Sequence, residues 1–386
     1  MHARQRPASY LLVALAFGGL SCTRTQEGPS PKPTAASQAA LTAMEDTVLR
    51  PSPTATDDQV GVAVALSADG TLALLGAPFD EAGQFADEGV VRVFARLSGA
   101  WAEQPSLRAT NGLANDHFGF AVALAPDGSR ALIGVPDDDT ARGADTGSAR
   151  VFVNTGAGWT QEAELVPADA ATGDSFGLAV ALSADGRRAF VGAPGDDTPQ
   201  GANTGSVRVF NRTAAGWAEE PALTGSMMTG SELLGLALCA NAAGTVVLAG
   251  ARGDSTAAGV GAGSVRVFEL MGTGWLEQAT LEAMGAAAGD AFGVTVALSA
   301  DATQALIGAS SDDTTAGVNS GSVRWFTRAG VGLAWTEAGT ILPASAAEAP
   351  GFGASLALRD DGLRAIIGSG QAGGNAGAAR VFTQSG

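Results

Sequence analysis

The sequence FGFAVALAPDG at residues 118–128 returns almost unchanged as FGLAVALSADG at residues 176–186. Its first glycine recurs every 58 residues, with a last interval of 60, at Gly61, Gly119, Gly177, Gly235, Gly293 and Gly353. Fifteen residues after each of these stands a second glycine, at Gly76, Gly134, Gly192, Gly250, Gly308 and Gly368. Such a period predicts one body built from similar units, although 386 residues would otherwise suggest two or three domains.

Each repeat contains four short apolar runs separated by turn residues, the pattern of four antiparallel strands. The third run is GSVRVF or a variant, and a tryptophan opens the fourth, at Trp101, Trp159, Trp217, Trp275 and Trp335. Four-strand repeats of about 40 to 50 residues are typical of propeller blades, and the extra length here falls in a loop after the second strand. The sequence therefore predicts an all-β fold, a six-bladed β-propeller of four-stranded antiparallel blades.

The two ends of the chain predict how the ring closes. The sixth repeat stops at residues 381–386, directly after its third strand. Leu49 precedes Gly61 by 12 residues, as Leu107 precedes Gly119, so residues 44–50 match the fourth strand that the last repeat lacks. We expect this N-terminal strand to complete the last blade and to cover its open edge. The propeller would then span residues 44–386.

The first residues have the order of an export signal: Arg4 and Arg6, an apolar run over residues 11–20, and then Cys22. Residues 19–22, Gly-Leu-Ser-Cys, resemble a bacterial lipobox, although leucine is usual at its first position. We expect residues 1–21 to be cleaved and Cys22 to be lipidated, giving an anchored lipoprotein at the outer membrane or cell surface. Ordinary cleavage nearby and a soluble secreted product is the alternative. Residues 22–43, rich in Pro, Ser, Thr and Ala, would form a flexible tether.

Charge and cysteine content limit the partners of the mature chain. Without residues 1–21 it has 20 basic residues against 39 acidic ones, a net charge near −19. Such a surface repels nucleic acid and anionic lipid head groups, so we expect membrane contact only through the N-terminal lipid. Cys239 is the one cysteine besides Cys22, which excludes a disulfide framework. We expect a monomer that is stabilised by packing.

The repeated phrases resemble a known family. Phe-Gly before the first strand and Gly-Ala-Pro after the second, as at residues 176–177 and 192–194, are similar to FG-GAP repeats, the blades of integrin α-subunit propellers. The resemblance covers residues 44–386 and implies the propeller fold. Three departures stand out: integrin-type propellers have seven blades, their D-x-D-x-D-G calcium loop is absent, and repeats four and six replace Gly-Ala-Pro with residues 250–252 and 368–370.

Nothing in the sequence assembles a catalytic site. His117 is the only histidine left after signal cleavage, no tyrosine remains, and no serine or cysteine stands in a nucleophile motif. A hydrolase that uses carboxylates alone is the residual alternative. We therefore expect a protein that is not an enzyme.

Carboxylates recur in the loop after the second strand and in the loop that enters the next blade, which should emerge on the same face. Clustered carboxylates in glycine-containing loops could bind Ca²⁺. Asp also caps turns by accepting its own backbone N–H groups, and the spacing here matches no established calcium loop. Both interpretations concern the same residues: Asp116, Asp137, Asp138, Asp139, Asp174, Asp196, Asp197, Asp290, Asp312 and Asp313.

Two functions remain open. One is a surface binding or adhesion module that presents these acidic loops to a protein or matrix partner. The other is a carbohydrate-binding propeller in which the repeated tryptophans line clefts between blades, although one tryptophan per outer strand also suits packing. The arginine of GSVRVF is expected to pair with a loop carboxylate. Residues 252–254 spell the adhesion tripeptide Arg-Gly-Asp, which a single change in the repeat consensus would generate.

Overall fold

The computed structural model describes residues 48–52, 58–81, 85–345, 350–370 and 377–384. The predicted signal, the tether, Cys22 and residues 44–47 of the closing strand lie outside the described residues. Within the described part of the chain, no helix is long and apolar enough to cross a membrane.

The first three blades are four-stranded antiparallel sheets. Blade 1 contains β1 (Val64–Leu66), β2 (Leu72–Ala77), β3 (Val90–Leu97) and β4 (Ala100–Leu107). Blade 2 contains β5 (Ala121–Leu124), β6 (Arg130–Val135), β7 (Ser148–Asn154) and β8 (Trp159–Leu165). Blade 3 contains β9 (Val180–Leu182), β10 (Arg188–Ala193), β11 (Ser206–Thr213) and β12 (Gly216–Glu219).

Blades 4 and 5 repeat this plan, and the described part of blade 6 has three strands. Blade 4 contains β13 (Ala237–Ala240), β14 (Val246–Ala251), β15 (Ser264–Met271) and β16 (Gly274–Leu281). Blade 5 contains β17 (Phe292–Leu298), β18 (Gln304–Ala309), β19 (Ser322–Thr327) and β20 (Thr336–Ile341). Blade 6 contains β21 (Phe352–Leu358), β22 (Arg364–Ser369) and β23 (Ala378–Thr383).

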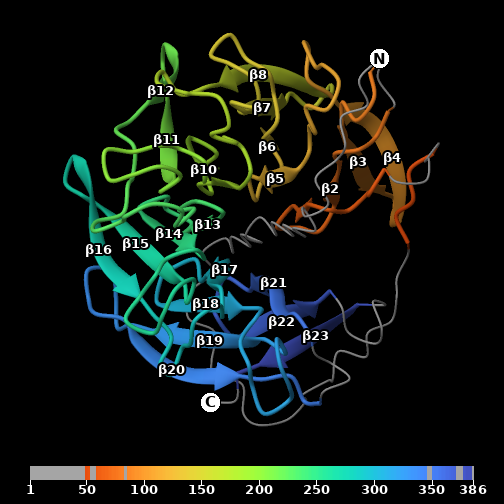
Figure 1. The fold of residues 1–386 in the computed structure, drawn as a ribbon. Helices are drawn as coiled ribbons and strands as arrows, with labels where there is room; N and C mark the ends of the chain where they lie inside the picture. Colours follow the sequence, from red (N-terminus) through yellow and green to blue (C-terminus); the bar gives the residue numbers. More distant parts are fainter. Residues whose placement is uncertain (1–47, 53–57, 82–84, 346–349, 371–376, 385–386) are drawn as a thin grey trace, which may run out of the picture.

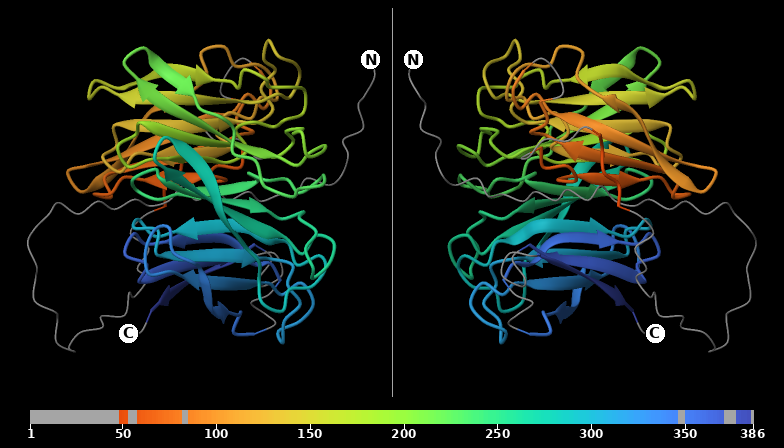
Figure 2. Two further views of the ribbon diagram at one scale, coloured as in Figure 1. Left: turned by 90° about the vertical axis from the view of Figure 1, so that its left-hand side faces the viewer. Right: turned by 90° about the vertical axis from the view of Figure 1, so that its right-hand side faces the viewer.

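The blades are arranged around a common axis, with the first strand of each sheet innermost (Figure 1). Edge-on views show the strands running across the ring from one face to the other (Figure 2). The six-bladed all-β propeller predicted from the repeat is confirmed.

The core consists of apolar layers between neighbouring blades. Between blades 1 and 2, Leu74 from β2 and Ile133 from β6 are fully buried and belong to one cluster with Phe118 and Phe152. The rings of Phe118 and Phe152 meet edge to face with their centroids 5.9 Å apart. Burying a side chain of this size stabilises the fold by about 1.5–3 kcal/mol, so the repeated strands are held together chiefly by these layers.

The two repeated glycines meet at each interface between packed blades. Gly177 enters blade 3 with φ +104°, a backbone conformation that favours glycine. A Cβ on Gly134 of blade 2 would lie 1.9 Å from the carbonyl oxygen of Gly177, which leaves room for no side chain. The 58-residue glycine pattern therefore records a close backbone contact between neighbouring blades.

The interface between blades 6 and 1 differs from the other five. A Cβ on Gly368 would have Ser355 of its own blade as its nearest neighbour, whereas the corresponding Cβ of Gly308 in blade 5 would meet Gly353 of blade 6. Ile366 and Val381 of blade 6 are 37% and 58% exposed, although their counterparts in blades 2 to 4 are fully or almost fully buried. The described residues of blades 6 and 1 thus lack the packing that joins the other blades.

The short N-terminal stretch that the structure describes nevertheless follows the repeat. Pro51 is buried, and the backbone N–H of Ser52 donates to Oε2 of Glu103 at 3.0 Å. The equivalent backbone N–H groups make the same contact with the next outer strand at Thr110, Ala168, Ser226 and Met284. Ser52 therefore occupies the position that follows an outer strand. The closing strand over residues 44–50 is not confirmed: residues 48–50 belong to no strand, and residues 44–47 are not described.

Candidate functional site

One face of the ring carries both sets of long loops. We call it the loop face: it consists of the loops after β2, β6, β10, β14 and β18 and the loops that lead into β5, β9, β13, β17 and β21. The two sets are hydrogen-bonded to each other, for example where the N–H of Phe118 donates to Glu88 O at 3.0 Å and that of Phe176 to Thr146 O at 3.1 Å. The short turns between the first and second strands of each blade lie on the opposite face, called the turn face.

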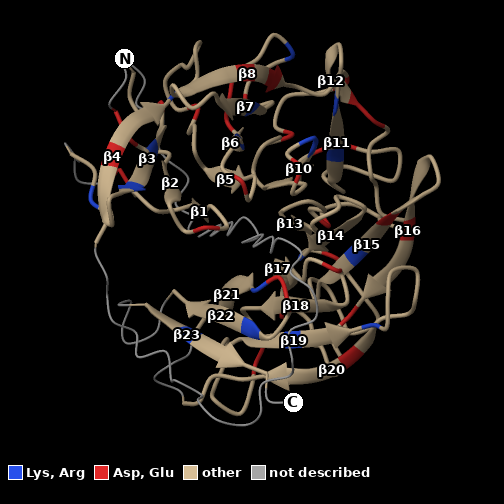
Figure 3. Cartoon of the chain, turned by 180° about the vertical axis from the view of Figure 1, so that it is seen from behind, with Lys and Arg blue, Asp and Glu red and all other residues tan. Residues whose placement is uncertain are grey.

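The arginine of each GSVRVF phrase pairs with an aspartate of the long loop in its own blade. Nη2 of Arg150 lies 2.5 Å from Oδ2 of Asp138, and Arg150 also contacts Asn111 and Glu164. The same pair recurs as Arg208 with Asp196, Arg266 with Asp254, Arg324 with Asp312, and Arg92 with Asp80. These arginines pair in turn with acidic residues on the outer strands, so blue and red segments neighbour each other on β15 and β16 (Figure 3). The expected arginine–carboxylate pairing is present, and it fixes Asp138, Asp196 and Asp312 as structural partners.

A second carboxylate in the same loop caps the loop backbone. Oδ1 of Asp139 accepts the N–H of Asp145 at 2.9 Å, and Asp197 and Asp313 accept those of Asn203 and Asn319 at 2.8 Å. Asp145, Asn203 and Asn319 have φ near +50°, a conformation that Asp and Asn tolerate better than most residues. The capping interpretation from the sequence therefore describes Asp139, Asp197 and Asp313, which still expose their side chains.

The aspartates that enter the next blade are buried caps. Oδ2 of Asp116, Asp174 and Asp290 accepts the N–H of the residue three positions earlier, at 2.6, 2.7 and 2.6 Å. Burial raises the pKa of Asp116 to about 6, the hydrogen bond from Leu113 opposes this shift, and nearby Asp138 and Asp139 add to it. Burial likewise raises the pKa of Asp174 and of Asp290.

The remaining predicted ligand, Asp137, lies beside a histidine. Its Oδ2 is 2.5 Å from Nδ1 of His117, whose ring also contacts that of Phe79. Among the described residues, no group of three or more His, Cys, Asp or Glu side chains is arranged to hold a metal ion. The structure brings Asp116, Asp138 and Asp139 near one another, but each of them has a hydrogen-bond partner within the chain.

The Arg-Gly-Asp tripeptide is built into the same scheme. Asp254 is buried, its Oδ2 lies 2.9 Å from Nη2 of Arg266, and it accepts the hydroxyl of Ser264. Burial lowers the pKa of Arg252, which is half-buried. Asp254 of the tripeptide thus forms the aspartate–arginine pair that recurs in blades 1 to 5, and it is not a free aspartate.

The loop face also carries exposed apolar side chains that the sequence reasoning missed. Val260 and Val318, at the same position in the long loops of blades 4 and 5, are 77% and 74% exposed. In the loops that enter the next blade, Met227 and Met284 are 91% and 74% exposed. A search for large apolar residues inside the Gly- and Asp-rich loops would have found them.

The repeated tryptophans pack between blades. Trp159, Trp217, Trp275 and Trp335 are half-buried, and each packs against the apolar cluster at the interface with the preceding blade. Nε1 of Trp275 donates to Oε2 of Glu220 at 2.7 Å, and its ring meets Phe190 edge to face. Cys239 is a buried core residue, as expected from its place in a strand, and burial raises its thiol pKa.

A comparison with known protein families identifies three of the repeats. The FG-GAP repeat family model matches residues 101–152, 159–210 and 275–324. Each match begins at or near the outer strand of one blade and ends in the third strand of the next. No curated protein matches the sequence.

Solved structures resemble the fold at low sequence identity. A candidate 6-phosphogluconolactonase from Bacteroides fragilis is 13% identical with a TM-score of 0.53, covering 83% of this chain and 79% of its own. A protein of unknown function from Desulfotomaculum acetoxidans is 12% identical with a TM-score of 0.52, covering 83% and 81%. A candidate 6-phosphogluconolactonase from Bacteroides uniformis gives 12%, 0.52, 83% and 80%. At this identity the likeness concerns the propeller fold alone.

Proposed function

Because this chain is a β-propeller built of FG-GAP repeats, we propose that it is a non-enzymatic binding module whose loop face contacts a protein or matrix partner. Function on such scaffolds belongs to variable loops, since the strands are occupied with packing between blades. The observation that carries the proposal is the combination of exposed apolar side chains and exposed carboxylates on this one face.

The chemistry of the loop face defines the partner. Val260, Val318, Met227 and Met284 offer apolar contact area to a partner. Methionine side chains adapt well to irregular surfaces. Asp139, Asp197 and Asp313 remain exposed beside them and favour basic side chains on the partner. We therefore expect a protein surface that combines apolar and basic residues, bound more weakly as the salt concentration rises.

Catalysis has no support from the residues of the mature chain. His117 is its one histidine and is paired with Asp137, and the loop aspartates are paired with arginines or backbone N–H groups. Two of the structural relatives are named as lactonases, but that activity belongs to those proteins. Sequence identities of 12–13% are too low to assign it to this chain.

A carbohydrate-binding propeller is the alternative, and the tryptophan positions weaken it. A sugar stacks on an accessible aromatic face, but Trp159, Trp217, Trp275 and Trp335 pack into the layers between blades.

For the location of the protein, we propose export and anchoring through lipidated Cys22, followed by the tether over residues 22–43. Mass spectrometry of the mature N-terminus tests this, and an unmodified residue other than Cys22 there would refute it.

Two arrays test the binding proposal. Purified mature protein is applied to a matrix-protein array and to a glycan array, and signal on the protein array alone is expected. Val260→Asp with Val318→Asp should then remove the signal. The matched control is Leu276→Asp, which places the same charge at an exposed leucine of outer strand β16. Glycan binding that survives the loop changes would overturn the proposal in favour of the alternative.

A further inference from the structure

Asn111 lies on the loop face, in the loop that enters blade 2, and its side chain contacts the buried arginine of that blade. Nη1 of Arg150 donates to Oδ1 of Asn111 at 2.9 Å. The same guanidinium also contacts the carboxylates of Asp138 and Glu164. Asn111 itself is exposed, so water reaches its side-chain amide. One partner of this arginine is thus an amide, whereas the two others are carboxylates.

Blade 3 places a carboxylate where blade 2 has this amide. Asp169 stands 58 residues, one repeat, after Asn111. Its Oδ1 lies 2.7 Å from Nη1 of Arg208, which corresponds to Arg150 of blade 2. The two loops therefore make the same contact with the same guanidinium nitrogen. An aspartate at position 111 would fit beside Arg150 as Asp169 fits beside Arg208.

The residue after Asn111 is a glycine, and this is the one Asn-Gly pair in the sequence. Because glycine has no Cβ, the backbone nitrogen that follows Asn111 is less hindered than the one that follows any other asparagine of the chain. A Cβ on Gly112 would lie 2.8 Å from Oε1 of Glu88, so a larger residue would fit here only if Glu88 moved. The packing of this loop therefore favours the residue that lets the backbone nitrogen approach the Asn111 side chain.

We propose that Asn111 and Gly112 form a site of self-modification, at which the side-chain amide of Asn111 is hydrolysed to a carboxylate through a cyclic imide. The backbone nitrogen of Gly112 gives up its proton to water and forms a bond to Cγ of Asn111. The bond between Cγ and Nδ2 breaks, and the side-chain nitrogen takes up a proton from water and leaves as ammonia. A water molecule then opens the imide ring at one or the other carbonyl carbon, which gives aspartate or isoaspartate.

Arg150 assists both the reaction and its product. Attack on Cγ shifts negative charge onto Oδ1 of Asn111, which already accepts a hydrogen bond from the guanidinium. A charged donor aimed at the oxygen where charge develops lowers the barrier. An aspartate at position 111 then offers the guanidinium a full charge in place of a dipole. The reaction thus adds a carboxylate to the loop face and forms in blade 2 the pair that blade 3 already has.

Peptide mapping by mass spectrometry tests the proposal on the full mature chain, incubated in its folded state at mildly alkaline pH. We expect the replacement of NH₂ by OH at Asn111, at a rate at least equal to that in a free peptide with the sequence of residues 108–116. The share of aspartate over isoaspartate should be larger in the folded chain than in the peptide, because Arg150 is positioned to pair with an aspartate side chain.

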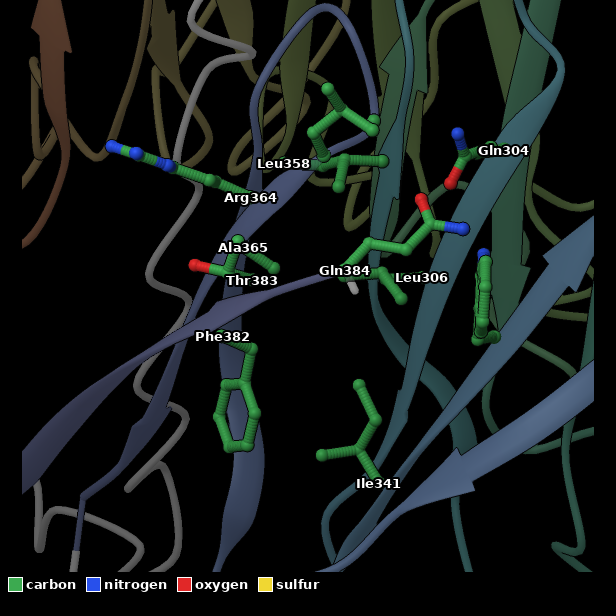
Figure 4. A pocket seen from close by; sticks show the side chains of 12 residues that line it. Gln304, Leu306, Ile341, Leu358, Arg364, Ala365, Phe382, Thr383 and Gln384 are labelled. Carbon is green, nitrogen blue, oxygen red and sulfur yellow. The ribbon is translucent and has the colours of Figure 1, made fainter. Parts of the chain in front are cut away.

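Two glutamines are internal controls in the same mass map. Gln304 and Gln384 carry side-chain amides at the edge of the cavity between blades 5 and 6 (Figure 4). A glutamine side chain is one methylene group longer than that of asparagine, so it closes a less favourable ring with the following nitrogen. We expect these amides to stay unchanged while Asn111 reacts.

Blade 3 offers the matched variants. Asp169→Asn alone creates an Asn-Ala pair beside Arg208, since Ala170 follows. This asparagine should react roughly tenfold more slowly than Asn111, because the alanine side chain hinders the approach of the backbone nitrogen. Adding Ala170→Gly reproduces the Asn-Gly pair of blade 2 and should restore the rate seen at Asn111.

The outcomes separate clearly. An unchanged Asn111 in the folded chain, under conditions in which the free peptide reacts, would overturn the proposal, because it would show that the loop blocks the attack. Equal rates in Asp169→Asn with and without Ala170→Gly would overturn the role of the glycine. Asn111→Asp supplies the product directly and should melt no lower than the unaltered chain, since a partly exposed pair changes stability little. A clear fall in its melting temperature would overturn the pairing with Arg150.

Discussion

The interface between blades 3 and 4 and the interface between blades 6 and 1 are built from the same repeat, but among the described residues only the first is packed. Between blades 3 and 4, Phe190 is fully buried and Gly192 lies directly against Gly235. In blade 6 the corresponding Ile366 is 37% exposed, and Gly368 has no such neighbour in blade 1. The repeat unit therefore carries the contacts of a blade with its neighbour, whereas the closing of the ring by residues 44–50, which precede the first repeat, stays a prediction.

Deleting residues 44–51 should lower the stability of the protein more than any other change considered below. We expect the closing strand to cover the edge of β23, so its loss would expose Ile366 and Val381 further. A melting temperature lower by about 10 °C or more is expected, since several kcal/mol shift a domain of this size by that order. Calorimetry measures it, and deletion of residues 30–37 in the tether is the control. Equal melting temperatures for both deletions would disprove closure by this strand.

Arg150→Met should be the costliest single substitution. The Arg150 side chain is fully buried, and removing it leaves the carboxylate of Asp138 buried without its charged partner. Breaking a buried pair in this way costs about 3–5 kcal/mol. Arg380→Met changes the same repeat position in blade 6, where the side chain is only half-buried, and about 1 kcal/mol is expected. Urea unfolding compares the two, and equal losses would show that blade 6 is as tightly packed as blade 2.

The sequence predicted those features of the fold that depend on contacts between neighbouring repeats. The 58-residue spacing of Gly119 and Gly177 predicted the blades because each spacing corresponds to one physical contact between neighbours. The pairing of Arg150 with a loop carboxylate was also predictable, since a buried charge needs a partner. The exposed Val260 was not predicted, because it does not repeat in every blade and pattern searches find what repeats.

The tryptophan layer at the packed interface between blades 3 and 4 and the tryptophan position of the predicted closing strand should respond oppositely to substitution. Trp275→Ala removes the ring packed on Phe190 and the hydrogen bond to Glu220, so a loss of about 3 kcal/mol in the free energy of unfolding is expected. If residues 44–50 form the closing strand, Ala43 takes the position that tryptophan holds in the other outer strands, and Ala43→Trp should raise the free energy of unfolding by about 1 kcal/mol. Urea unfolding measures both, with Ala39→Trp in the tether as control. A gain from Ala39→Trp equal to that from Ala43→Trp would contradict the register of the closing strand.

Asp116 and Glu232 test the loop face itself, since they hold the same position in two blades but have opposite pKa shifts. Burial raises the pKa of Asp116 to about 6. Burial also acts to raise the pKa of Glu232, but hydrogen bonds from the N–H groups of Thr229 and Gly230 outweigh it and lower that pKa.

The signs follow from proton binding. Folded Asp116 holds its proton to higher pH than the unfolded chain does, so its stabilising contribution is complete below pH 4 and is lost as the pH rises through 6. Asp116→Asn keeps an oxygen acceptor for Leu113 without the charge, so it should be more stable than the unaltered chain at pH 7.5, by roughly 2 kcal/mol, with the difference vanishing near pH 4. Glu232→Gln should be less stable than the unaltered chain at pH 7.5, with its deficit shrinking as the pH falls. Urea unfolding at pH 4, 5.5 and 7.5 measures both, and differences of the same sign at pH 7.5 would mean that the two carboxyl groups share one environment.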